Sequence, residues 1–117
     1  MIQKINFGEI WLADLNPKVG TEPDKMRPVL IIQDQILLDT AHPSTLIIPL
    51  TTKLIDNAEP LRIRLEANNQ LEKDSDLLID QIRAIDNKRF GIGPLTLCEK
   101  NFMKKVYKAI VEIIGGG

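Results

Sequence analysis

Short apolar segments separated by turn residues, followed by one long amphipathic segment, constrain the fold of this chain more than any other feature. Residues 61–66 (LRIRLE) alternate strictly between apolar and charged side chains, which is the pattern of a β-strand with one buried face. Short segments rich in aliphatic residues at 9–15, 27–33, 45–52 and 77–85 predict further strands. So many short strands imply a small, strongly bent sheet or an open barrel.

Prolines and glycines modify these strands. Pro28 has no backbone N–H to donate, so it belongs at the start of its strand, and Pro49 inside strand 45–52 indicates a sheet edge or a bulge. The consecutive aliphatic residues 29–32 predict a strand that is buried on both faces. Residues 88–97 contain two glycines and a proline and predict a last, broken strand.

The C-terminal segment 99–114 is predicted to be an amphipathic helix that packs on the sheet. Its apolar residues recur at helical spacing, and its lysines lie largely off that stripe. Thr96 and Glu99 have the T-x-x-E form of a capping box at its start. Between two of the strands, residues 36–38 are compatible with a turn of helix.

Size and composition are those of one globular domain over residues 1–117, with 44% hydrophobic and 26% charged residues. The formal net charge of −1 gives no general attraction to nucleic acid, so a local basic patch would have to hold such a partner. Cys98 is the single cysteine, which excludes an internal disulfide and a cysteine-based zinc site. The chain has no signal peptide or membrane-length apolar run, and we expect it to be soluble and cytoplasmic.

Polar residues at strand ends are the candidates for chemistry. The chain has no P-loop, no G-x-G-x-x-G and no paired His or Cys motif, so no metal or cofactor is indicated. Arginine holds phosphate through a two-pronged contact, a threonine hydroxyl can donate to a phosphate oxygen, and a carboxylate can accept a proton. The candidates are Arg27, Thr51, Thr52, Asp80, Gln81 and Arg83.

Each of these residues also has an ordinary structural explanation. Arg27 is compatible with a surface ion pair to the preceding acidic loop, and Asp80 with an ion pair to Arg83. A threonine at a strand end commonly satisfies a turn, and Trp11 fits a core position better than a platform for stacked bases. The residue types alone leave these alternatives open.

Four short motifs follow one another along the chain. They are GEIWLADLNP at 8–17, GTE with RPVLII within 20–32, PLTT at 49–52 and DQIRAID at 80–86. In this order they resemble G-[DE]-[IV]-[WY]-x-x-D-[LF]-x-P, G-[ST]-E-x-x-x-x-R-P, P-[LI]-T-[ST] and [DE]-Q-[IV]-[RK]-x-[IL]-D of the MazF/PemK toxin family. The resemblance covers about residues 8–114, and the four motifs are specific through their order and separation.

The resemblance implies a mainly β fold with one C-terminal helix, a small SH3-like barrel of the PemK type that is related to the gyrase poison CcdB. It also implies a sequence-specific endoribonuclease toxin that acts as a homodimer on single-stranded RNA without a metal or other cofactor. The products would be a 2′,3′-cyclic phosphate and a 5′-OH. A cognate antitoxin with a flexible, acidic C-terminal part would neutralise it by lying over the RNA site, and no membrane is involved.

The resemblance also assigns roles to residues. The family's key arginine and threonine fall on Arg27 and Thr51, which would stabilise the charge on the phosphoryl oxygens and hold a nonbridging oxygen. Asp80 is a candidate base by similarity to some members, and the assignment of base and acid stays open. Contacts with the substrate are expected from Lys18, Thr21, Glu22, Lys25, Thr52, Lys53, Gln81 and Arg83.

Two points set limits to this interpretation. The loop 18–26 has Pro-Asp-Lys where the family often has Gln-Gly-Gly, so the RNA sequence that is cut does not follow from the resemblance. A CcdB-like DNA gyrase poison without ribonuclease activity is the alternative from another functional class, and an inert antitoxin-binding module is a third. Cleavage of RNA in EDTA discriminates among these functions.

Overall fold

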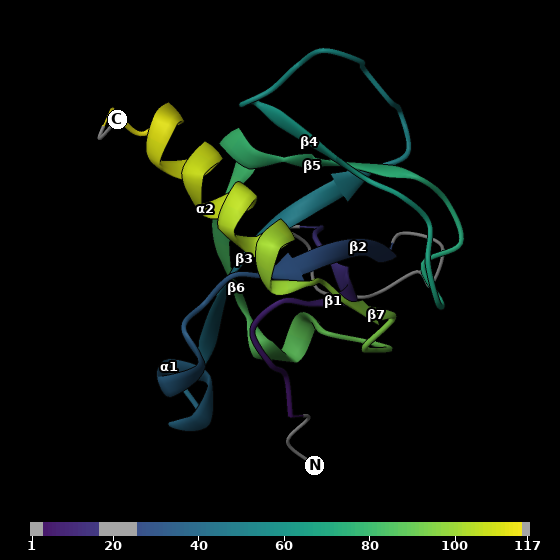
Figure 1. Cartoon of the computed structure of the whole chain (residues 1–117). Coiled ribbons are helices and arrows are strands. Elements are labelled where there is room, and N and C mark those ends of the chain that lie inside the picture. The colour runs from purple at the N-terminus through teal and green to yellow at the C-terminus, as the bar shows by residue number, and fades with distance from the viewer. Residues whose placement is uncertain (1–3, 17–25, 116–117) are drawn as a thin grey trace.

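A curled, antiparallel sheet forms the body of the computed structural model, which describes residues 4–16 and 26–115 (Figure 1). The strands are β1 (Glu9–Asp14), β2 (Met26–Ile31), β3 (Ser44–Thr51), β4 (Arg62–Leu65), β5 (Ser75–Leu78), β6 (Arg83–Asp86) and β7 (Thr96–Leu97). The helices are α1 (Gln35–Asp39) and α2 (Lys100–Ile113), with short 3-10 turns η2 (Ile79–Gln81) and η3 (Asn87–Arg89). The mainly β architecture with a C-terminal helix confirms the sequence-based fold class.

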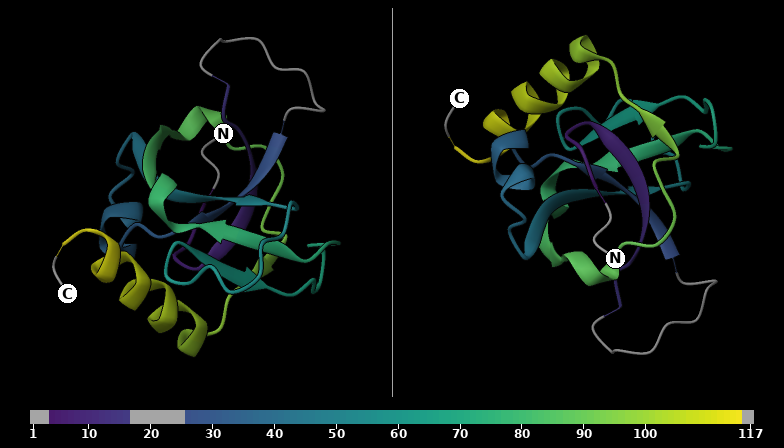
Figure 2. Two further views of the ribbon diagram at one scale, coloured as in Figure 1. Left: turned by 90° about the horizontal axis from the view of Figure 1, so that it is seen from above. Right: turned by 90° about the horizontal axis from the view of Figure 1, so that it is seen from below.

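Strand β3 organises the sheet, because it pairs with three other strands. Along the sheet the order is β4-β5-β3-β2-β1-β7, and β6 pairs with β3 outside this path. On the side away from β2, β3 pairs with β6 through Ile47 and with β5 from Leu50 onward. The two views of Figure 2 show how this arrangement curls the sheet, with α2 lying along one of its faces.

Three sequence-based expectations are wrong for reasons of tertiary pairing. Pro49 does not mark a sheet edge: it is buried in an internal strand, where β3 changes partner from β6 to β5, and the alternative, a bulge, stays a prediction. Residues 77–85 are not one strand, since β5 and β6 pair with opposite ends of β3 and η2 must connect them. The capping box does not form, because the Thr96 hydroxyl bonds with Asn68 while Glu99 makes no side-chain cap.

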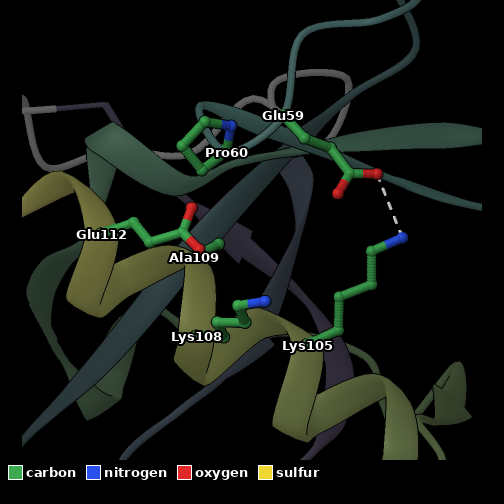
Figure 3. A pocket seen from close by; sticks show the side chains of 6 residues that line it. All are labelled: Glu59, Pro60, Lys105, Lys108, Ala109 and Glu112. Atoms are coloured by element: carbon green, nitrogen blue, oxygen red, sulfur yellow. Dashed lines mark ion pairs between the residues drawn. The ribbon is translucent and has the colours of Figure 1, made fainter. Parts of the chain in front are cut away.

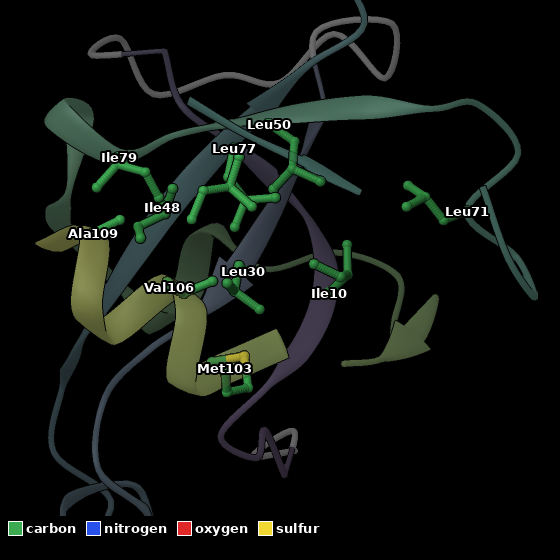
Figure 4. Packing of buried hydrophobic residues seen from close by; sticks show 11 residues of the cluster. Ile10, Leu30, Ile48, Leu50, Leu71, Leu77, Ile79, Met103, Val106 and Ala109 are labelled. Carbon is green, nitrogen blue, oxygen red and sulfur yellow. The ribbon is translucent and has the colours of Figure 1, made fainter. Parts of the chain in front are cut away.

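Alternation along the strands divides the apolar residues between the two faces of the sheet. One cluster packs beneath α2 (Figure 4) and comprises Ile10, Leu30, Ile48, Leu50, Ile63, Leu71, Leu77, Ile79, Met103, Val106 and Ala109. The other lies on the opposite face and comprises Ile5, Trp11, Ala13, Val29, Ile31, Ile47, Ile85 and Phe90. Burying one such aliphatic side chain contributes about 1.5–3 kcal/mol, so the packing of α2 on the sheet contributes substantially to the stability of the fold.

Burial in β1 and β2 agrees with two predictions: a core position for Trp11 and burial of β2 on both faces. Leu30 faces α2 while Val29 and Ile31 face the other way, and all three are fully buried, which confirms burial of β2 on both faces. Trp11 is 5% exposed, donates from Nε1 to Glu9 Oε1 over 3.0 Å, and meets Phe90 edge to face. It is therefore a core residue, as expected.

Candidate functional site

Arg27 and Thr51 are brought together by the pairing of β2 with β3. The two strands run antiparallel with Val29 opposite Pro49, and continuing this register by two residues sets Arg27 opposite Thr51. Residues directly opposite each other in an antiparallel pair share a face, with Cβ atoms about 4.5–5.5 Å apart. Two of the four sequence motifs therefore meet at one end of the sheet.

The same line of opposed residues continues into the next two strands. Thr51 lies opposite Asp76 of β5, and Asp76 lies opposite Arg64 of β4. These four residues, Arg27, Thr51, Asp76 and Arg64, form what we call the cross-strand row. Neighbouring strands lie about 4.8 Å apart, so the row spans roughly 14 Å, on the face of the sheet that α2 does not cover.

Arg27 and Thr51 differ in exposure and in hydrogen bonding. Arg27 is exposed and donates from Nη1 to the Met26 carbonyl over 3.3 Å. Thr51 is half-buried, and its Oγ1 accepts a hydrogen bond of 3.2 Å from the backbone N–H of Lys53. A hydroxyl both accepts and donates, so this end of the sheet carries a guanidinium fork and an O–H donor, two groups that suit a tetrahedral anion.

Asp76 and Arg64 are the members of the row that the sequence analysis missed. The Asp76 side chain is 1% exposed, and both carboxylate oxygens are occupied: Oδ1 accepts from Arg64 Nε (2.5 Å), and Oδ2 accepts from Arg62 Nη1 (3.3 Å) and the Ile55 N–H (2.9 Å). The alternation of 61–66 puts two arginines on one strand face, but it does not identify the carboxylate that they bond.

Burial and hydrogen bonding act on Asp76 in opposite directions. Burial by itself raises the pKa of this carboxyl group, whereas the bonds from Arg64, the Ile55 amide and Arg62 lower it. The net result is a pKa below the ordinary value for aspartate. In turn, Asp76 and then Asp56 raise the pKa of the Arg64 guanidinium, so the row carries fixed charges at neutral pH.

Of the remaining candidates, the structure brings Thr52 and Lys53 next to the row and leaves Asp80, Gln81 and Arg83 farther along the sheet. Thr52 and Lys53 are exposed in the turn that leaves β3, directly after Thr51. Arg83 of β6 is opposite Ile47, which puts it on the same face as the row but about 13 Å farther along β3. Exposed Asp80 and Gln81 belong to η2, which connects β5 to β6 beside β3. Four further candidates, Lys18, Thr21, Glu22 and Lys25, fall outside the described residues.

A hollow lies against α2, away from these candidates (Figure 3). It has a volume of about 250 Å³ and lies between α2 and the connection that precedes β4. Its lining carries charges of both signs, including an ion pair of 3.0 Å between Lys105 Nζ and Glu59 Oε2. None of the candidate residues lines it, so the structure separates this hollow from the cross-strand row.

The described part of the chain shows no metal cluster and no helix that could span a membrane. Residues 4–16 and 26–115 contain no group of three or more His, Cys, Asp and Glu side chains placed to hold a metal ion. Within the same ranges, neither helix has the length and apolar character that crossing a membrane requires.

Comparisons with known proteins identify first the fold of the chain and then its family. Its fold is that of a solved mycobacterial endoribonuclease in complex with its cognate antitoxin: the TM-score is 0.70, at 17% identity, with 96% of this chain and 94% of that chain covered. A family model described as PemK-like, MazF-like toxin of type II toxin-antitoxin system matches residues 6–114, and the chain belongs to this family.

Two relatives are similar over nearly their whole length. The chain is 33% identical over 107 residues to endoribonuclease EndoA of Bacillus subtilis, covering 91% of this chain and 90% of the relative. It is 36% identical over 110 residues to endoribonuclease MazF of Staphylococcus saprophyticus, covering 92% and 89%. The family resemblance found in the motifs is thereby confirmed.

Proposed function

We propose that Arg27 and Thr51 are the catalytic pair of a sequence-specific, metal-independent endoribonuclease that cleaves single-stranded RNA. The chain is an endoribonuclease toxin of the MazF type, since it belongs to that toxin family and both relatives above are named endoribonucleases. The same relatives favour this function over a CcdB-like gyrase poison. The observation that carries the residue assignment is the β2–β3 register, which has Val29 opposite Pro49 and, continued by two residues, puts Arg27 opposite Thr51.

The chemistry suits these two side chains. The 2′-OH attacks the adjacent phosphorus, the bond from phosphorus to the 5′-oxygen breaks, and that oxygen takes up a proton, which leaves a 2′,3′-cyclic phosphate and a 5′-OH. Negative charge gathers on the phosphoryl oxygens in the transition state. Arg27 would stabilise this charge and the Thr51 hydroxyl would donate to a nonbridging oxygen; losing one such donor typically costs ~3 kcal/mol, or about a hundredfold in rate.

Proton transfer involves other groups. A guanidinium holds its proton firmly at neutral pH, so Arg27 is a poor proton donor. Asp80, exposed on η2, is our candidate for the base. Substrate contacts would come from Thr52 and Lys53 beside the row, from Gln81 and Arg83 farther along the sheet, and from Lys18, Thr21, Glu22 and Lys25 in the segment between β1 and β2. Bases of single-stranded RNA are read by hydrogen bonds to their exposed edges, which such side chains can make.

The partners would be a cognate antitoxin and a second copy of the chain. The mycobacterial structure with its cognate antitoxin supports the first partner. An acidic antitoxin segment would compete with RNA for Arg27 by charge as well as by shape. Exposed apolar side chains on α1 and β3, among them Ile36 (72%), Leu37 (48%) and Leu46 (40%), support the homodimer. A monomeric mass by light scattering at micromolar concentration would contradict it.

One experiment tests the proposed catalytic pair. Pure protein is incubated with a long single-stranded RNA in EDTA, and the new 5′ ends are mapped and tested for a 5′-OH. We expect discrete cuts by the wild type and cleavage about a hundredfold slower by Arg27→Ala or Thr51→Ala. Matched controls are Lys104→Ala, an exposed cation on α2, and Thr40→Ala, a threonine after α1. Cleavage that requires Mg²⁺, or that proceeds at the wild-type rate in both site variants, would overturn the proposal.

A further inference from the structure

We propose that Asp76 is a positioning residue, which fixes the turn after β3 and, through this turn, the hydroxyl of Thr51 for RNA cleavage. The inference rests on the proposed function. It concerns a buried carboxylate that lies outside all four sequence motifs, and it explains how an exposed turn can hold a reacting group in place.

The turn that follows Thr51 is tied to β4 and β5 by side chains. Asp76 Oδ2 accepts from the Ile55 N–H over 2.9 Å, and Arg62 Nη1 donates both to this oxygen (3.3 Å) and to the Lys53 carbonyl (2.9 Å). Asp76 therefore holds the turn directly at one residue and through Arg62 at another.

The last link connects the turn to Thr51. The Lys53 N–H donates to Thr51 Oγ1 over 3.2 Å, so the position of Lys53 determines which lone pair of this oxygen is occupied and where its O–H can point. Thr51 and Asp76 also lie opposite each other in the sheet. A closed circuit of contacts thus runs from Asp76 through Arg62 and Lys53 to Thr51 and back across the strands.

Exposure of the turn makes these ties important. Residues 52–57 are all exposed, and an exposed segment without such bonds opens locally at little free-energy cost. A displacement of about 1 Å at a reacting group lowers a rate by up to roughly a hundredfold. Asp76 would then affect the cleavage step more than RNA binding, because it bonds to the turn and not to Arg27, the exposed cation of the row.

The test is a double-mutant cycle on the full chain. Asp76→Ala, Thr51→Ala and the double variant are compared with the wild type by single-turnover cleavage in EDTA, and by binding of an RNA with 2′-O-methyl groups, which cannot be cleaved. We expect Asp76→Ala to slow cleavage by roughly tenfold or more and to change RNA affinity less than about threefold. In the Thr51→Ala background, where the hydroxyl is absent, we expect less than about a twofold further effect.

Two more variants keep the test independent of folding. Asp76→Asn retains one acceptor oxygen and should slow cleavage less than Asp76→Ala does, with amide hydrogen exchange of Ile55 faster than in the wild type. Glu59→Gln is the matched control, an exposed carboxylate of the same connection that bonds Lys105 instead. It should cleave as the wild type does.

The outcomes separate the inference from the function on which it rests. A folded Asp76→Asn or Asp76→Ala protein that cleaves at the wild-type rate overturns the inference alone. So does an equally large effect of Asp76→Ala with and without the Thr51 hydroxyl. Wild-type protein that leaves RNA intact in EDTA overturns the proposed function, and this inference with it.

Discussion

The two faces of the sheet differ in what their residues do, although both are built by the same strands. At the end of the sheet that carries the row, Leu50, Leu77 and Ile63 point toward α2 and are buried. Their sequence neighbours Thr51, Asp76 and Arg64 point to the opposite face and form three of the four members of the cross-strand row. In each of these strands, one residue packs in the core beneath α2 and its neighbour belongs to the cross-strand row.

This comparison teaches that the apolar core positions the row. Since successive side chains of a strand point to opposite faces, burial of one residue determines where its neighbour points. A slip of one residue in β5 would turn Asp76 toward α2 and Leu77 toward the face of the row. Core packing therefore controls the geometry of the candidate site without contributing an atom to it. The predictions below test this separation of roles, beginning with the largest effect.

Shortening a buried side chain on the α2 face of the sheet should lower the stability of the fold most. We expect Leu77→Ala, at a fully buried position, to lower the free energy of unfolding by about 2–5 kcal/mol, because it removes apolar contacts and leaves a cavity. Urea-induced unfolding followed by circular dichroism measures this. An effect below about 1 kcal/mol would mean that the two faces do not differ as described.

Truncation in the row should damage activity and spare the fold. We expect Thr51→Ala to slow RNA cleavage about a hundredfold, or ~3 kcal/mol in transition-state stabilisation. The free energy of unfolding should change by about 1 kcal/mol or less, since the bond that the Thr51 side chain accepts comes from the Lys53 N–H of an exposed turn. Parallel cleavage and urea-unfolding assays check both values. A loss of stability as large as that of Leu77→Ala would contradict the separation.

Acid should weaken the row before it affects the apolar face. Asp76 has a pKa below the ordinary aspartate value in the folded protein, so its ionised form stabilises the fold above that ordinary value. This contribution is lost as the pH falls from about 4 toward the lower pKa of the folded state. Thermal unfolding between pH 6 and pH 3 should show a shallower dependence for Asp76→Asn than for the wild type. Identical slopes for the two proteins would contradict the role of the ionised carboxylate.

The smallest effect is expected on the outer surface of α2. Lys105 and Glu59 form an ion pair in which both side chains are more than half exposed. Glu59→Gln should change the free energy of unfolding by at most about 1 kcal/mol, and less in high salt. Thermal unfolding at low and high ionic strength measures it. A larger effect would show that the hollow beside α2 has a structural role comparable to that of the core.

Particular residues show how far the sequence could predict this structure. The alternation around Ile63 located β4, and the helical spacing of Met103, Val106 and Ile110 located α2. The family motifs singled out Arg27 and Thr51 as a candidate pair. Asp76 stood outside every motif, and no local signal indicated that Arg62 and Arg64 would enclose it.

Local periodicity was thus enough to locate most elements and the mainly β class, because it depends only on side chains a few residues apart. The pairing of β3 with three strands, and with it the place of Pro49, the break at η2 and the cross-strand row, was decided only in the tertiary structure. Register between strands depends on which apolar residues share a core, and those residues are distant in the sequence. The chemistry of single residues was visible in the chain, whereas their proximity required the folded sheet.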